Sequence, residues 1–221
     1  MTTTPVTHIY FLLDRSGSMN SIASDVIGGF NQFLEEQQRN GDDARMTFVQ
    51  FDSSNPHEVI ANALPIAEVR PLTADTFTPR GGTPLFDAMG SLITDATIRG
   101  EAEGNDEVVI FVTFTDGHEN CSANYSREAI FELVAKREAQ GWTFVYLGAN
   151  QDSYAAGGGM GYHADNVQDF EASPEGARLA FQSLSKGMAK ERGKIRHSAA
   201  RLTSEFFEGD KEAEADLRRP Y

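Results

Sequence analysis

The chain has 221 residues, of which 40% are hydrophobic and 24% charged, proportions typical of a single globular domain. The formal net charge of −14 argues against a duplex nucleic-acid binder, because such proteins neutralise phosphates with Lys and Arg. The single cysteine, Cys121, excludes an internal disulfide and favours a reducing compartment. The first apolar run, residues 9–13, is too short for a signal peptide or a membrane span. We therefore expect a soluble, cytoplasmic protein that makes no membrane contact.

Short apolar runs alternate along the chain with segments of helical periodicity, a pattern typical of repeated βα units. Strands are predicted at residues 8–13, 46–51, 57–61, 107–115 and 142–148, with a short one near Val167. Helices are predicted at residues 19–40, 84–99 and 126–140, and from 174 through 188. The run 107–115 is the most apolar in the chain, which predicts a central parallel strand that is buried on both faces. The glycines between 157 and 161 predict a flexible loop.

The C-terminal residues differ from the rest in their charge pattern. A basic stretch covers residues 186–201, and an acidic run follows at 205–216. We interpret this part as a solvated helical extension or tail. The predicted organisation is one domain over residues 1–190 and a charged extension over residues 191–221.

Polar side chains gather in three loops that the predicted topology brings to one edge of the sheet. Ligands of open parallel sheets bind at the carboxyl ends of the strands, where the strand order reverses. The loops offer two carboxylates and three hydroxyls, namely Asp14, Ser16, Ser18, Thr83 and Asp116. Hard oxygen ligands of this kind suit Mg²⁺ or Mn²⁺. The sequence therefore predicts a divalent-cation site at this edge.

The motifs in these loops are Asp-x-Ser-x-Ser after the first strand, Gly-Gly-Thr before the second helix and Thr-Asp-Gly after the central strand. Together they resemble a von Willebrand factor A (vWA) domain over about residues 7–190, and the five residues match its metal-ion-dependent adhesion site (MIDAS). The resemblance implies an α/β fold with three layers: a doubly wound, Rossmann-like, mostly parallel sheet with one short antiparallel edge strand. The weak strand at 57–61 is the candidate for that edge.

By the same resemblance, Ser16 and Ser18 contact the Mg²⁺ or Mn²⁺ ion directly, and Thr83 alternates between direct and water-mediated contact. Asp14 and Asp116 act through bound waters or accept hydrogen bonds from the serines. The ion keeps an open position that the carboxylate of a partner protein can fill. This implies an intracellular protein-interaction module, not an enzyme, with no catalytic residue and no organic cofactor. An AAA+ ATPase or a stress-response system is the expected class of partner.

Two other functions stay open from the sequence. A Mg²⁺-dependent phosphatase or hydrolase also places an Asp at a strand end, but here no second carboxylate stands two residues after Asp14. Alternatively, the metal site is silent and a scaffold binds its partner through residues 191–221.

Structural readings of single residues are also open. Asp14 and Ser16 are common helix-capping residues, and their role could be limited to that. His118 and Cys121 lie close after Asp116, but a zinc site usually needs four ligands at recognisable spacing, and no second Cys or His pair is present.

Overall fold

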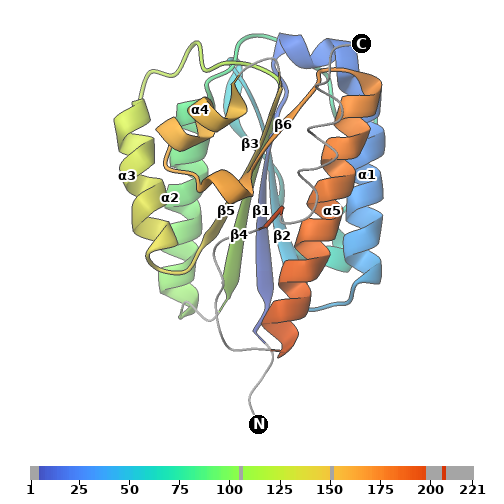
Figure 1. The fold of residues 1–221 in the computed structure, drawn as a ribbon, viewed down its shortest axis with the longest axis vertical. Coiled ribbons are helices and arrows are strands. Elements are labelled where there is room, and N and C mark those ends of the chain that lie inside the picture. The colour runs from blue at the N-terminus through green and yellow to red at the C-terminus, as the bar shows by residue number, and fades with distance from the viewer. Residues whose placement is uncertain (1–4, 105–106, 150–151, 198–205, 208–221) are drawn as a thin grey trace.

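The computed structural model describes residues 5–104, 107–149, 152–197 and 206–207 (Figure 1). The strands are β1 (Thr7–Asp14), β2 (Ala44–Asp52), β3 (Asn55–Pro65), β4 (Val108–Thr115), β5 (Thr143–Ala149) and β6 (Val167–Phe170). The helices are α1 (Ala23–Arg39), α2 (Leu85–Glu103), α3 (Arg127–Glu138), α4 (Ser153–Gly159) and α5 (Pro174–His197). Short 3-10 segments are η1 (Gly17–Ile22), η2 (Ile66–Glu68) and η3 (Ala164–Asn166).

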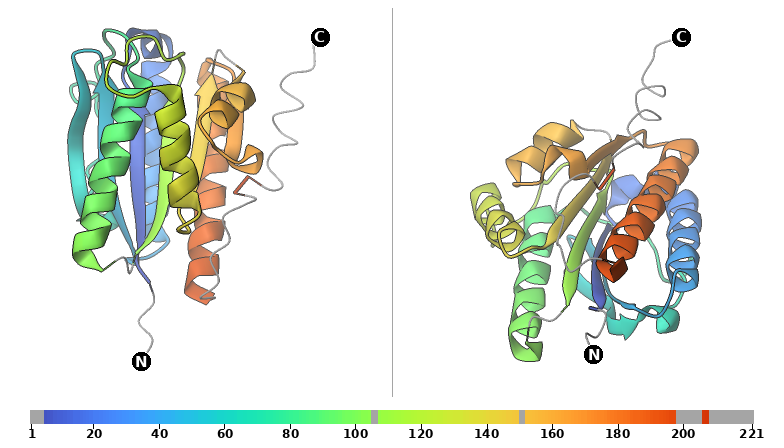
Figure 2. Two further views of the ribbon diagram at one scale, coloured as in Figure 1. Left: turned by 90° about the vertical axis from the view of Figure 1, so that its left-hand side faces the viewer. Right: turned by 60° about the horizontal axis from the view of Figure 1, so that its bottom comes forward.

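The strands form a six-stranded sheet in the order β3-β2-β1-β4-β5-β6. All neighbours are parallel except β2 and β3, which pair antiparallel at the edge. Helices α1 and α5 cover one face, and α2 and α3 cover the other, with α4 beside β5 and β6 (Figures 1 and 2). This confirms the prediction of a three-layer, doubly wound sheet with one antiparallel edge strand.

The two faces of the sheet have separate cores because alternate residues of a strand point to opposite sides. Phe11 of β1 faces α1, where its ring meets that of Phe30 edge-on with the centroids 5.2 Å apart. Its neighbour Tyr10 packs into the other core, against residues of α2. Every residue of β1 is buried, as expected for a strand at the centre of a parallel sheet.

The strand order reverses at β1, and this reversal creates the edge at which ligands of such sheets bind. The chain passes from β1 to β2 on one side, while β4 joins β1 on the other. Leu13 of β1 pairs with Phe114 of β4, so the two strands end at the same level. The loops that follow Asp14 and Thr115 therefore start side by side.

Two elements differ from their predictions. Strand β3 covers Asn55–Pro65 and is longer than the predicted 57–61. Its pairing with β2 contains register shifts, which interrupt the regular alternation of side chains on which the sequence prediction depends. Glycines 157–159 form the end of helix α4, so the prediction of a loop is wrong there. The side chain of Asp152 caps this helix by accepting a hydrogen bond from the N–H of Ala155, and the cap offsets the low helix propensity of glycine.

Helix α5 continues past residue 190, where the charge pattern of the sequence predicts the start of the extension. The Arg192 side chain is completely buried and donates to the backbone oxygens of Gln37 and Gly41 and to Asp43 Oδ1, the last at 2.6 Å. The expected solvated face is therefore wrong at this position. Residues 198–205 and 208–221 lie outside the described residues, so the division into domain and tail stays a prediction.

Asp43 anchors the end of α5, and this contact predicts a pH-dependent stability. Hydrogen bonds from Arg196 and Arg192 lower the pKa of Asp43 from 3.8 to about 2. Because the folded pKa lies below the unfolded one, the stabilisation is present above about pH 4 and is lost as the pH falls through 2. We expect Asp43→Asn to lower the free energy of unfolding at pH 7 by up to about 2 kcal/mol, with a smaller difference from wild type at pH 3.

Urea unfolding at both pH values measures this difference. The exposed neighbour Asp42 offers the matched control, Asp42→Asn, for which we expect no change. An equal loss for both variants, or a loss for Asp43→Asn that does not shrink at pH 3, would contradict the role of Asp43.

No helix among the described residues is long and apolar enough to cross a membrane.

Candidate metal centre

The carboxylate of Asp14 is fixed at the point where β1 ends. Its Oδ1 accepts a hydrogen bond from the backbone N–H of Ser16, and its Oδ2 accepts one from Thr115 Oγ1, both at 2.6 Å. Asp14 is completely buried. Because Thr115 is the last residue of β4, the second bond joins the ends of the two neighbouring strands.

Ser16, Ser18 and Asp116 continue this network toward the surface. Ser16 Oγ lies 3.0 Å from Ser18 Oγ, and Ser18 Oγ donates to Asp116 Oδ1 at 2.6 Å. Ser16 and Asp116 are buried, whereas Ser18 is exposed. The network thus runs from the buried Asp14 to a hydroxyl that solvent or another molecule can reach.

Gly117 forms the floor of a small cradle between the loops. A Cβ atom at this position would lie 3.2 Å from Thr83 Oγ1, 3.3 Å from Ser18 Oγ and 3.9 Å from Asp14 Oδ2. Oxygen atoms from the loops after β1 and before α2 therefore face one point beside the loop after β4. With Ser16 and Asp116 in the same network, the structure brings together all five residues singled out in the sequence.

The electrostatics of the cradle suit a cation. Burial raises the pKa of Asp14 to about 7, although hydrogen bonds from Thr115 and Ser16 oppose the shift, and burial also raises the pKa of Asp116. Arg15 does not neutralise Asp14, because its guanidinium donates to Asp52 instead. Two buried carboxylates beside three hydroxyls form a donor set that fits a hard divalent cation.

The donor set lies outside the pattern of a soft-metal site. Within the described ranges, no group of three or more His, Cys, Asp or Glu side chains could hold a metal ion. The only cysteine, Cys121, is exposed as a residue. Partial burial of its thiol and the nearby charge of Glu119 raise the pKa of that thiol. The zinc alternative at His118 and Cys121 therefore gains no support from these residues.

Backbone hydrogen bonds hold the glycine loop before α2 against the loop after β1. Gly17 N–H donates to the carbonyl of Gly81 at 3.0 Å, and Arg80 N–H donates to the carbonyl of Arg15 at 2.9 Å. Gly81 has a φ of +66°, a conformation that side-chain-bearing residues rarely adopt. Glycine at position 81 is therefore favoured in the turn that leads to Thr83.

Residues 119–125, which follow the Asp116 loop, are attached to the start of α2 by two carboxylates. Asp87 accepts hydrogen bonds from the backbone N–H groups of Ala123, Asn124 and Tyr125 at 2.8–2.9 Å. Glu119 accepts one from the N–H of Phe86 at 2.9 Å. Burial favours a higher pKa of Asp87, but the hydrogen bonds that Asp87 accepts outweigh it and lower that pKa. Together with the Glu119 bond they fix the Asp116 loop relative to α2.

A reciprocal pair completes the attachment close to the cradle. Thr83 N–H donates to Asn120 Oδ1 at 2.9 Å, and Asn120 N–H donates to the carbonyl of Thr83 at 3.1 Å. The sequence does not reveal the positioning roles of Asp87, Glu119 and Asn120. Their partners are backbone groups more than 30 positions away, and no motif spacing marks such contacts.

Comparison with solved structures finds similar folds at low sequence identity. The pilus adhesin SpaC from Lactobacillus rhamnosus GG, in its open conformation, matches with a TM-score of 0.64 and 14% identity over 86% of this chain and 30% of its own. The VWA domain of SpRpn10 matches with a TM-score of 0.53 and 10% identity over 88% of this chain and 99% of its own. The chain has a vWA fold.

Another match is proximal thread matrix protein 1 from the mussel byssus, in a structure with a zinc-occupied MIDAS motif. Its TM-score is 0.57, with 16% identity over 86% of this chain and 48% of its own. The chain thus covers less than half the length of this protein and of SpaC. No protein-family model and no curated protein sequence matches the chain. At these identities the likeness establishes the vWA fold alone.

Proposed function

We propose that this chain is a metal-dependent protein-interaction module that holds Mg²⁺ or Mn²⁺ at a MIDAS. The ligand set comprises Asp14, Ser16, Ser18, Thr83 and Asp116. The main support is the convergence of hydroxyl and carboxylate oxygens on the space above Gly117. Further support comes from vWA-fold neighbours whose structures hold a metal, zinc in the mussel byssus protein and manganese in the TRAP protein of Plasmodium vivax.

In this proposal the hydroxyl groups bind the metal ion, and the two aspartates position them. The hydroxyls of Ser16, Ser18 and Thr83 would be neutral ligands, while Asp14 holds the loop geometry through Ser16 and Thr115. Asp116 accepts a hydrogen bond from the Ser18 hydroxyl, which leaves the lone pairs of that oxygen available to a metal ion. A divalent ion held largely by neutral oxygens supplies positive charge that a carboxylate of another molecule can neutralise.

The partner in this proposal is a protein that presents an Asp or Glu side chain. A chain with a net charge of −14 repels acidic molecules as a whole, so the metal must supply the attraction for that carboxylate. In this proposal the chain binds a partner and does not catalyse a reaction. We further propose an adaptor in the cytoplasm, working with an AAA+ ATPase or a stress-response system, since a single exposed thiol suits a reducing compartment.

Selection of displayed peptides on the immobilised protein, in millimolar Mg²⁺ with elution by EDTA, tests this function. We expect enrichment of an Asp or Glu at one fixed position. The matched variant Gly117→Ala keeps all five ligands but places a methyl group 3.2 Å from Thr83 Oγ1, so it should lose the enrichment. Peptides without an acidic position, or equal enrichment with Gly117→Ala, would contradict the proposal.

A further inference from the structure

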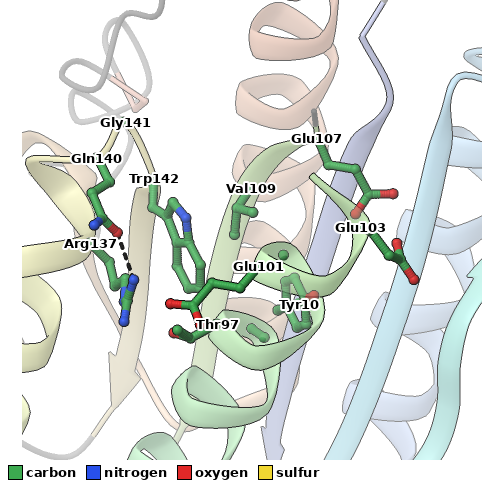
Figure 3. A pocket seen from close by; sticks show the side chains of 12 residues that line it. Tyr10, Thr97, Glu101, Glu103, Glu107, Val109, Arg137, Gln140, Gly141 and Trp142 are labelled. Atoms are coloured by element: carbon green, nitrogen blue, oxygen red, sulfur yellow. Dashed lines mark hydrogen bonds between the residues drawn. The ribbon is translucent and has the colours of Figure 1, made fainter. Parts of the chain in front are cut away.

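A pocket of about 320 Å³ lies at the end of the sheet opposite the metal site, where β4 and β5 begin (Figure 3). The C-terminal turns of α2 and α3 form its sides, and Tyr10, Val109 and Trp142 line the sheet side. Its volume falls at the lower end of the range for small-molecule sites. None of the residues assigned to the metal centre lines this pocket.

Arg137 of α3 contributes a buried cation to this pocket. Only 8% of the residue is exposed. Its Nη1 donates to Gln140 Oε1 at 2.6 Å, while its Nε is buried without a hydrogen-bond partner. No carboxylate among the described residues forms an ion pair with Arg137. Burial of a guanidinium without an anion is costly, so this arrangement needs an explanation.

The other two buried arginines of the described residues each have the carboxylate partner that Arg137 lacks. Arg15 pairs with Asp52 at 2.7 Å, and Arg192 pairs with Asp43 at 2.6 Å. Acidic side chains outnumber basic ones 33 to 19, so the lack of a carboxylate at Arg137 does not reflect a shortage of acids. The Trp142 ring, 5.7 Å from the guanidinium carbon, and the C-terminus of α3 stabilise the charge only in part.

The other side chains that line the pocket indicate the shape and charge of a ligand that could pair with Arg137. The rings of Tyr10 and Trp142 are parallel, with centroids 6.2 Å apart, and of the two Trp142 lies next to Arg137 (Figure 3). Glu103 and Glu107 on the far side are paired with Arg99 and Arg45, at 2.8 and 3.2 Å. These acids still disfavour a second negative charge.

Glu101 extends from α2 into the same opening and is exposed (Figure 3). It adds a further negative charge beside the pocket, and no ion pair neutralises it within the described chain. A phosphate or a dicarboxylate would therefore be repelled. A monoanion seated on Arg137 would be tolerated.

We propose that this pocket binds a small aromatic monocarboxylate. The carboxylate accepts hydrogen bonds from the Arg137 guanidinium, and the ring of the ligand packs against Trp142 and Tyr10. The site is independent of the proposed metal centre, so the chain would combine a protein-binding edge with a small-molecule site at the opposite end of the sheet.

Trp142 is the only tryptophan of the chain, so its fluorescence reports on this pocket directly. We would titrate the full chain with phenylacetate and indole-3-acetate, and with phenylacetamide as a neutral analogue of the first. We expect saturable changes with both acids and at least tenfold weaker binding of the amide, since the amide lacks the charge that Arg137 requires. The indole of the second acid absorbs and emits near Trp142, so its binding is followed by calorimetry.

Arg137→Gln should weaken the binding of phenylacetate at least tenfold, and Arg127→Gln, at the exposed start of the same helix, should leave it unchanged. Circular dichroism checks that both variants fold. If Arg137→Gln does not fold, the comparison of acid with amide on the wild type decides alone. Equal binding of acid and amide, or no saturable change up to ten millimolar of either acid, would overturn the proposal.

Discussion

Asp14→Ala is expected to abolish stabilisation of the protein by Mg²⁺ or Mn²⁺. A ligand that binds only the folded state stabilises it by about 2.7 kcal/mol at a hundred times its Kd, which for a chain of this size is a rise in Tm of about 5–10 °C. Asp14 holds both Ser16 and Thr115, so its loss removes a carboxylate and releases the loop that carries two hydroxyl ligands. Thermal melts in EDTA and in millimolar metal measure the effect.

Asp75→Ala is the matched control, because Asp75 is an exposed acid outside the site. We expect it to keep the full metal-dependent rise. A rise that persists in Asp14→Ala would show that the metal binds elsewhere on this acidic chain. In that case the five-residue site would be wrong.

Asp87→Ala is expected to give the largest loss of stability among the substitutions considered. Three backbone N–H groups, of Ala123, Asn124 and Tyr125, would lose a charged acceptor. An unsatisfied buried donor costs about 1–3 kcal/mol, and partial access of water to this loop reduces the sum. We expect the free energy of unfolding in urea to fall by about 3–5 kcal/mol, together with weaker metal binding, because the Asp116 loop loses its attachment to α2.

Asp95, on the same helix, provides the comparison. Its carboxylate is 62% exposed and meets His57 at 2.9 Å, so Asp95→Ala should cost less than about 1 kcal/mol. Equal costs for the two variants would contradict the role given to Asp87. A large loss of stability with unchanged metal affinity would limit that role to folding.

The sequence was informative about the fold where a physical constraint is local. Strand β4 is a nearly continuous apolar run, because both of its faces are covered by helices, and such a run is visible without a structure. The glycines of α4 show the opposite case, in which the local sequence gives the wrong prediction. Their propensity predicts a loop, whereas the Asp152 cap and packing beside β5 and β6 hold a short helix.

In the candidate site, too, the sequence reveals the residues that are close together in the chain and misses those that only folding brings together. Asp14, Ser16 and Ser18 are close in sequence, so their spacing alone indicates a turn that gathers oxygens. Asp87 and Glu119 act through backbone groups that only the folded chain brings near. The basic stretch predicts a solvated face for Arg192, yet this side chain is buried against its partners at the α1–β2 connection.

Titration of the full chain with Mn²⁺, followed by electron paramagnetic resonance, tests whether the cradle above Gly117 is a metal centre. We predict one saturable Mn²⁺ site per chain that is lost in Asp14→Ala and in Gly117→Ala. The signal of the bound ion should change when an acidic peptide from the selection is added, because a carboxylate enters the open position. Absence of saturable binding, or a site that both variants retain, would contradict the account of the cradle above Gly117 as a metal centre.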